Sequence, residues 1–207
     1  MTDSDMDLTA PELSPDDFLR IEDPHFDASN VAIVTGAASG IGRATATALA
    51  SNGLTVVGAD IDAEGLDETG DLVEEFDAPG AYHGVETDLT NDADVEAVVD
   101  AAAEEGELRY VANIAGMQHI ASIAEFPMEK YDLLLDIMLR SPFKMAQGAI
   151  PHIEATGDGV GAIGNMSSVH GHYATKDKPA YITAKHGLTG LTRAIAAEGS
   201  GTLRGVS

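Results

Sequence analysis

The sequence of 207 residues contains no cysteine and no tryptophan. Without cysteine it can form no disulfide framework, no thiolate nucleophile and no cysteine-ligated metal site. No hydrophobic run approaches the roughly 20 residues that a membrane-spanning helix needs. The first residues, MTDSDMD, are acidic, whereas a signal peptide begins with basic residues. These absences predict a cytoplasmic protein that does not span a membrane.

Basic residues are scarce, because 11 Lys and Arg stand against 35 Asp and Glu, for a formal net charge of −24. Residues 44–108 hold 18 acids and no base. Such a surface repels nucleic acids and anionic membranes, since both bind proteins through basic patches. High salt screens the self-repulsion of the acids. The composition therefore favours a protein from a halophile's cytoplasm over an ordinary acidic protein.

A turn of small residues follows the first strongly apolar segment. Val31–Val34 is short and β-branched, which predicts a buried strand, and TGAASGIG and an amphipathic helix from Arg43 come next. Strand, glycine turn and helix start form a phosphate-binding device. Gly36 can turn tightly, Gly40 lets the backbone approach a pyrophosphate, and Gly42 lets the helix pack closely. The N–H groups at the helix start attract an anion.

A second apolar strand, predicted at Leu54–Ala59, ends in Asp60, which lies 18 residues after Gly42. An acid at this place can accept hydrogen bonds from the ribose hydroxyls of NAD. No Lys or Arg lies in residues 35–42 or directly after Asp60, so a 2′-phosphate would find no partner. The pattern favours NAD over NADP, and the alternative is an ordinary strand–loop–helix with a solvated aspartate.

Strands and helices alternate through the rest of the sequence. This alternation predicts one α/β domain over residues 30–207, a doubly wound parallel sheet (Rossmann fold) that binds ligands at the carboxyl ends of its strands. Residues 1–29 are expected to form an acidic arm that is mobile or loosely docked, with one or two helical turns after Ser14. The further strands are expected at about 81–87, 108–114, 160–166 and 202–207, and the further helices at about 61–76, 92–103, 128–149 (kinked at Pro142) and 179–198.

Tyr181 and Lys185 are four residues apart in a helical stretch and so share one face of it. An ammonium group beside a phenol favours the phenolate, which brings a tyrosine toward general acid–base strength. Ser168 lies 13 residues before Tyr181, at the end of a predicted strand, where its hydroxyl can hold a substrate oxygen. The alternative for Tyr181 and Lys185 is a surface pair. Asp88 also ends a strand, either near an adenine or as a cap of the next helix.

These elements together resemble the short-chain dehydrogenase/reductase family over about residues 31–207: TGAASGIG, Asp60, NIAG at 113–116, Ser168 and Tyr181-x-x-x-Lys185 match its motifs in order and spacing. The resemblance implies a Rossmann fold, NAD(P) binding and hydride transfer to or from a carbonyl. It implies a homo-oligomer, a tetramer or dimer built through two long helices. It implies catalysis by Ser168, Tyr181 and Lys185, and a cofactor held by those last two residues and by Gly36, Ser39, Gly40, Ile41, Gly42, Asp60, Asp88, Leu89, Asn113, Ala115 and Gly116.

Three further segments are similar to one group in the family, the D-3-hydroxybutyrate dehydrogenases: AGMQHI at 115–120, SVHG at 168–171 and KPAYITAKHG at 178–187. The similarity implies that Gln118, His170 and Lys178 hold a substrate carboxylate, beside Ser168 and Tyr181. The reaction expected is oxidation of (R)-3-hydroxybutyrate to acetoacetate. The alternatives are a dehydrogenase of another alcohol or sugar, or a non-catalytic NAD-binding or assembly subunit.

Other interpretations of these residues remain open. Gln118 and Lys178 could be solvated loop residues, and His170 could merely pack. No metal site is expected, because His119, His170 and His172 have no further ligand at a convincing spacing.

The sequence departs from the family in two places. Met138 stands where the family usually has an asparagine that opens a water path to the lysine, and a methionine cannot make those hydrogen bonds. Asp136, two residues earlier, is a poor substitute. Family members also usually continue further, with a loop beside the nicotinamide, a substrate lid and a last strand. We therefore expect either a fragment that lacks the last strand and the substrate lid, or a half-open pocket, with an unpaired sheet edge.

Overall fold

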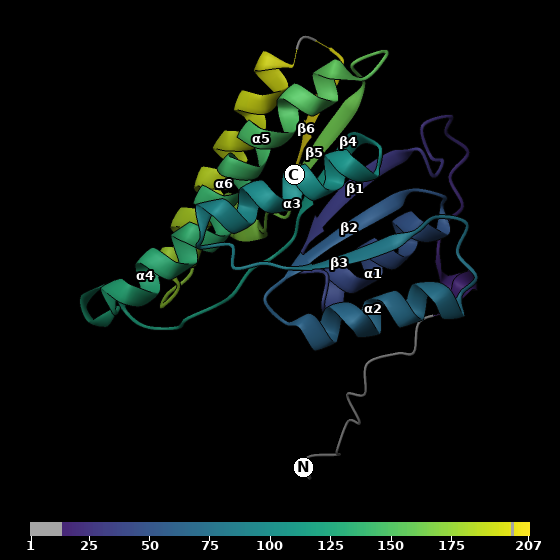
Figure 1. Ribbon diagram of the computed structural model, residues 1–207. Coiled ribbons are helices and arrows are strands. Elements are labelled where there is room, and N and C mark those ends of the chain that lie inside the picture. Colours follow the sequence, from purple (N-terminus) through teal and green to yellow (C-terminus); the bar gives the residue numbers. More distant parts are fainter. Residues whose placement is uncertain (1–13, 200) are drawn as a thin grey trace.

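Six parallel strands form the centre of the computed structural model, which describes residues 14–199 and 201–207 (Figure 1). The strand order is β3-β2-β1-β4-β5-β6, and every neighbouring pair is parallel. This order confirms the predicted doubly wound α/β fold. The strands are β1 (Asn30–Thr35), β2 (Thr55–Asp60), β3 (Tyr82–Glu86), β4 (Glu107–Asn113), β5 (Gly161–Asn165) and β6 (Leu203–Val206).

Helices cover both faces of the sheet (Figure 1). Val31 and Ile33 of β1 pack with α3, α5 and α6, whereas Ala32 and Val34 pack with α1 and α2. Both faces of β1 are therefore buried, which explains its unbroken apolar run. The helices are α1 (Gly40–Ser51), α2 (Ala63–Glu75), α3 (Asp92–Glu105), α4 (Met128–Leu135), α5 (Ser141–Ala155) and α6 (Pro179–Glu198).

The helix predicted over 128–149 with a kink at Pro142 is present, but it is interrupted just before that proline and ends later than predicted. Helix α4 passes through a π-helical segment, Asp136–Arg140, into α5, which continues to Ala155. Pro142 lies in the first turn of α5. A proline ring clashes with the carbonyl four residues before it, here that of Met138, and a widened π turn relieves that clash. The interruption therefore lies directly before the proline.

The N-terminal segment that the structure describes, residues 14–29, runs along the amino ends of the strands. Asn52, directly after α1, accepts a hydrogen bond from Ile21 N at 2.7 Å and donates one to the carbonyl of Leu19 at 3.0 Å. The Phe26 ring meets the Tyr110 ring edge-on at 5.7 Å. The first 13 residues of the predicted acidic arm lie outside the described residues.

A nearly buried arginine joins several segments at the amino ends of the strands. The side chain of Arg109 on β4 is 7% exposed, and it donates to Asn30 Oδ1, to the carboxylate of Glu107 and to Asp158 Oδ1 at 2.6 Å. Asp158 also lies 2.8 Å from His25 Nε2. Arg109, the Val160 N–H and His25 hold the pKa of Asp158 well below its usual range. The stability that Asp158 contributes is present above about pH 4 and is lost as the pH falls further.

The substitution Arg109→Met is expected to lower the free energy of unfolding by about 2 kcal/mol, because it removes hydrogen bonds to charged groups and leaves Asn30 without its partner. Urea unfolding followed by circular dichroism measures the change. Arg193→Met is the control, since Arg193 is an exposed arginine of α6, and it should stay within roughly 0.5 kcal/mol of the parent. Equal effects of the two changes would contradict a fastening role for Arg109.

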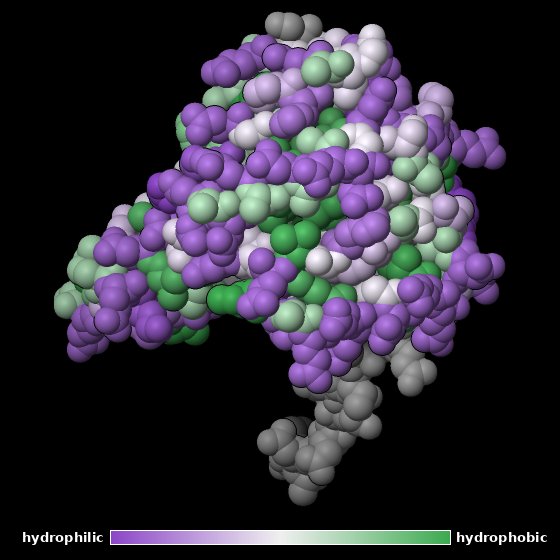
Figure 2. Space-filling view, in the orientation of Figure 1, coloured by the Kyte–Doolittle hydropathy of each residue, from purple (hydrophilic) through white to green (hydrophobic). Residues whose placement is uncertain are grey.

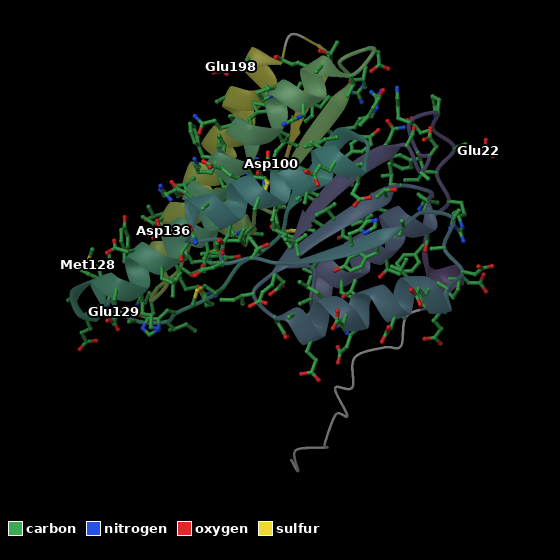
Figure 3. The ribbon with its side chains drawn as sticks, in the orientation of Figure 1. Glu22, Asp100, Met128, Glu129, Asp136 and Glu198 are labelled. Carbon is green, nitrogen blue, oxygen red and sulfur yellow. The ribbon has the colours of Figure 1, made fainter. Side chains whose placement is uncertain are left out.

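Acidic side chains cover the outside. Hydrophilic residues dominate the face in Figure 2, and hydrophobic residues show between them near its centre. The exposed Glu22, Glu129 and Glu198 project outward at three edges of the molecule (Figure 3). No helix within the described residues is long and apolar enough to cross a bilayer.

Candidate active site

A cavity of about 450 Å³ opens at the carboxyl ends of the strands. Residues from the ends of β1, β2, β3 and β4 and from the start of α1 line it. The structure brings together there most of the residues that the sequence analysis assigned to a cofactor, namely Gly36, Ser39, Gly40, Ile41, Gly42, Asp60, Asp88, Leu89, Ala115 and Gly116.

Each glycine of the turn is required for a different structural reason. Gly36 and Gly40 have φ angles of 74° and 53°, which other residues rarely adopt. A Cβ on Gly42 would lie 1.9 Å from the carbonyl oxygen of Gly36, so only glycine fits there. Space is open beside Gly40, and the Ser39 side chain makes no hydrogen bond that caps α1. The first turn of α1 therefore presents free N–H groups to the cavity.

Asp60 faces this cavity from the end of β2. Its carboxylate accepts hydrogen bonds from the N–H groups of Ala38 and Asp62, both at 3.2 Å. Arg43, on α1, does not line the cavity. Its guanidinium donates to Glu68 Oε2 at 2.6 Å and to the carbonyls of Ala38 and Gly65.

Asp88 lies in the same cavity, next to Leu89. The N–H and hydroxyl of Thr90 donate to its carboxylate at 2.9 and 2.7 Å, and they lower its pKa. The side chain that caps α3 is that of Asn91, which accepts from Ala93 N at 3.0 Å. Of the two interpretations of Asp88, the helix cap is therefore wrong.

Asn113 does not line the cavity but lies beneath it. Its amide donates to Asn165 Oδ1 at 2.9 Å, and the Asn165 amide donates to Thr192 Oγ1 at 3.0 Å. All three side chains are buried. This chain of hydrogen bonds joins β4, β5 and α6.

The three expected catalytic residues meet at one corner beside the cavity. Lys185 is 3% exposed, its Nζ lies 5.4 Å from the centre of the Tyr181 ring, and burial lowers its pKa to about 8. Its ammonium donates to the carbonyl of Met166, a residue that lines the cavity. Ser168 is joined to Tyr181 through His170, whose Nδ1 lies 3.3 Å from Ser168 Oγ and whose ring meets the Tyr181 ring at 5.7 Å.

The residues expected to hold a carboxylate come from neighbouring loops. Gln118 is exposed in the loop after β4, and Lys178 precedes α6. A backbone hydrogen bond of 3.0 Å from Ala121 N to the Asp177 carbonyl ties these loops together. Both ring nitrogens of His170 already have hydroxyl partners, Ser168 and Thr175. No cluster of three acids or histidines in the described part of the chain could hold a metal ion.

Sequence reasoning missed six further residues that line the cavity. Four of them are neighbours of assigned residues, and adjacency alone could have found them. Ile137 and Met166 had no sequence signal, because they come from the π-helical segment and from the residue after β5. The six are Ile61, Thr87, Ile114, Met117, Ile137 and Met166.

Comparisons with known proteins agree with this geometry. Residues 30–203 match the short chain dehydrogenase family. This chain belongs to that family. The D-threitol dehydrogenase of Mycolicibacterium smegmatis is 36% identical to it over 95% of this chain and 72% of its own. The D-beta-hydroxybutyrate dehydrogenase of Cupriavidus necator is 35% identical over 81% and 64%. The structure of carveol dehydrogenase from Mycobacterium avium in complex with NAD superposes with a TM-score of 0.78 at 30% identity, over 86% and 68%.

This family member spans only part of the length of these relatives. It covers 64% of the hydroxybutyrate enzyme and 65% of an uncharacterized oxidoreductase, YxjF, of Bacillus subtilis. The described sheet ends at β6, which pairs with β5 on one side.

Met138 lies in an apolar cluster of this family member. Its side chain is 1% exposed and packs with Leu134, Ala180 and Ala184, against which Tyr181 also lies. Its sulfur is 3.4 Å from the place where a Cβ on Gly116 would be. Met138 is therefore a packing residue here.

Proposed function

We propose that this chain is an NAD-dependent oxidoreductase that transfers hydride between the nicotinamide and a small hydroxy acid, with (R)-3-hydroxybutyrate as the best substrate. One observation carries the proposal. Met166 lines the cavity while its carbonyl accepts a hydrogen bond from Lys185, so the cavity directly adjoins the Ser168–Tyr181–Lys185 corner. A cofactor bound in the cavity would have its reactive end beside these side chains.

The residues present fit a dinucleotide. Gly36 and Gly42 approach each other so closely that a Cβ on Gly42 would not fit. The space beside Gly40 is open, and the free N–H groups of α1 face it. These groups would hold the pyrophosphate, and Asp60 would hold the adenine ribose. When bound, the nicotinamide supplies the acceptor for the hydride.

The side chains of the corner have distinct tasks in this mechanism. Tyr181 takes the proton of the substrate hydroxyl as its carbon gives up hydride. Ser168 holds the same oxygen by a hydrogen bond. The Lys185 ammonium, 5.4 Å from the centre of the Tyr181 ring, stabilises the phenolate form of Tyr181, which is the form that can accept this proton. Because burial lowers the pKa of Lys185 to about 8, its ammonium loses a proton as the pH rises above that value, and the stabilisation of the phenolate is then lost.

Asp60 is proposed to set the preference for NAD. The substitution Asp60→Asn removes its repulsion of a 2′-phosphate and is expected to raise the affinity for NADPH relative to NADH by about tenfold. Fluorescence titration with both nucleotides measures the ratio. Glu64→Gln removes one exposed charge from the start of α2 and should leave the ratio unchanged. A parent chain that binds NADPH as tightly as NADH would contradict this role of Asp60.

The proposed substrate is tested with a panel of alcohols. We expect (R)-3-hydroxybutyrate to give the largest kcat/KM when NADH absorbance is followed in molar KCl, ahead of D-threitol, carveol and cyclohexanol, substrates suggested by the names of relatives. Lys178→Met should raise the KM for the hydroxy acid and leave that for neutral alcohols alone, because only a carboxylate needs the ammonium. Lys176→Met is the control, because Lys176 is an exposed lysine in the same loop, and it should leave both KM values unchanged. A neutral alcohol as best substrate would overturn the hydroxy-acid assignment.

The burial of Met138 favours a second candidate, a subunit that binds NAD without catalysis. An apolar side chain at this position offers no hydrogen bonds to a proton path toward Lys185. This candidate predicts tight NADH binding with no turnover of any alcohol in the panel. Titration beside the activity measurement separates the two candidates.

A further inference from the structure

His170 bridges two hydroxyl groups at the catalytic corner. Its Nδ1 lies 3.3 Å from Ser168 Oγ, and its Nε2 lies 3.0 Å from Thr175 Oγ1. The edge-on contact with the Tyr181 ring, at 5.7 Å and 80°, holds the imidazole between them. Thr175 is exposed in the loop before α6, and neither a motif nor the cavity assigns it a task.

The tautomer of His170 decides what Ser168 can do. A neutral imidazole carries one N–H, and the other nitrogen can only accept. If the hydrogen is on Nε2, Ser168 gives its hydroxyl hydrogen to Nδ1 and loses it for the substrate. If the hydrogen is on Nδ1, this group donates to Ser168 Oγ, and the serine hydrogen is left for the substrate oxygen.

The hydrogen bonds of the Ser168 oxygen favour the tautomer with the hydrogen on Nδ1. The backbone N–H of His170 donates to Ser168 Oγ at 3.2 Å. A second donor, Nδ1–H, would occupy the other lone pair, so the only direction left for the Ser168 hydrogen would be away from His170. A hydroxyl that accepts two hydrogen bonds is also a stronger donor, because hydrogen bonds in a chain polarise one another.

We propose that Thr175 is a positioning residue, whose hydroxyl donates to His170 Nε2, fixes the Nδ1–H tautomer and so leaves the Ser168 hydroxyl free to hold the substrate oxygen. The proposal rests on the proposed dehydrogenase function. It differs from a carboxylate-binding role of His170, because a nitrogen bonded to Thr175 has no free direction toward a carboxylate.

The matched pair Thr175→Val and Thr175→Ser tests the proposal in the full chain. Valine keeps the shape of threonine without the hydroxyl, and serine keeps the hydroxyl. We expect Thr175→Val to lower kcat about five- to tenfold, as for the loss of one hydrogen bond between neutral groups, with the KM for NAD unchanged. Thr175→Ser should keep the parent kcat. An unchanged kcat in Thr175→Val, or equal losses in both variants, would overturn the proposal, and so would a rise confined to the KM for the hydroxy acid.

Nitrogen NMR of the histidine rings tests the same proposal without turnover. The resonance of His170 is identified by its absence in His170→Gln. In the parent chain and in Thr175→Ser, Nδ1 should carry the hydrogen, and in Thr175→Val the tautomer should shift toward Nε2–H. A parent chain with the hydrogen on Nε2 would overturn the proposal. If the parent oxidises no alcohol while the spectra are as expected, the proposed function fails and the role of Thr175 in fixing the tautomer stands.

Discussion

Tyr181→Phe is expected to lower turnover about a thousandfold and to leave NADH affinity unchanged. The substitution removes the single hydroxyl that takes the substrate proton, and general acid–base catalysis is worth roughly 10² to 10⁴ in rate. The ring itself stays, so its contacts with His170 and Lys185 stay. Steady-state rates with NAD and the best alcohol of the panel measure the loss, and NADH fluorescence measures the affinity.

Tyr173→Phe provides the control for this experiment. Tyr173 lies close by in sequence, between the serine and α6, but it is 74% exposed and outside the cavity. Removing its hydroxyl should leave both rate and affinity at parental values. If Tyr181→Phe kept most of the turnover, Tyr181 would not be the proton acceptor, and the proposed mechanism would fail even though the family assignment would remain.

Local sequence patterns predicted the elements that position the site. The helix expected at 179–198 is α6 with its bounds unchanged, because Pro179 can start a helix and a continuous apolar face follows it. The short strand expected after Thr202 is β6. The glycine turn was predictable for a stronger reason, since strand, turn and helix are contiguous there and their geometry depends on few residues.

Features that depend on distant partners could not be predicted in this way. The sequence shows Arg109 as one arginine in an acidic chain, whereas its partners Asn30, Asp158 and Val160 lie on two distant segments that only the fold brings to it. The same holds for Thr175, since its role follows from where the loop before α6 carries it. Pro142 did signal an interruption of the long helix, but its form, a π turn before the proline, depends on how α4 and the π-helical segment pack against α6.

Gly42→Ala is expected to destabilise the fold and to weaken NADH binding. The added Cβ would lie 1.9 Å from the carbonyl oxygen and 2.4 Å from the carbonyl carbon of Gly36, both backbone atoms. Since backbone cannot rotate away as a side chain can, α1 must move off the turn. Overpacking of this kind costs about 1–3 kcal/mol of stability and sometimes more. The displaced N–H groups would also lose the pyrophosphate, so we expect NADH affinity to fall at least about tenfold.

Gly190→Ala is the matched control, because it adds the same methyl group to another helix. Gly190 lies in α6, and no atom would come within 4 Å of its new Cβ. Alanine is the better helix former by roughly 0.5–1 kcal/mol, so this variant should unfold at a higher urea concentration than the parent and bind NADH equally well. Opposite signs for the two variants would show that the damage at Gly42 comes from the close approach of α1 to the turn. A Gly42→Ala chain that binds NADH like the parent would mean that the pyrophosphate is not held at this helix start, and the cofactor assignment would then lose its structural basis.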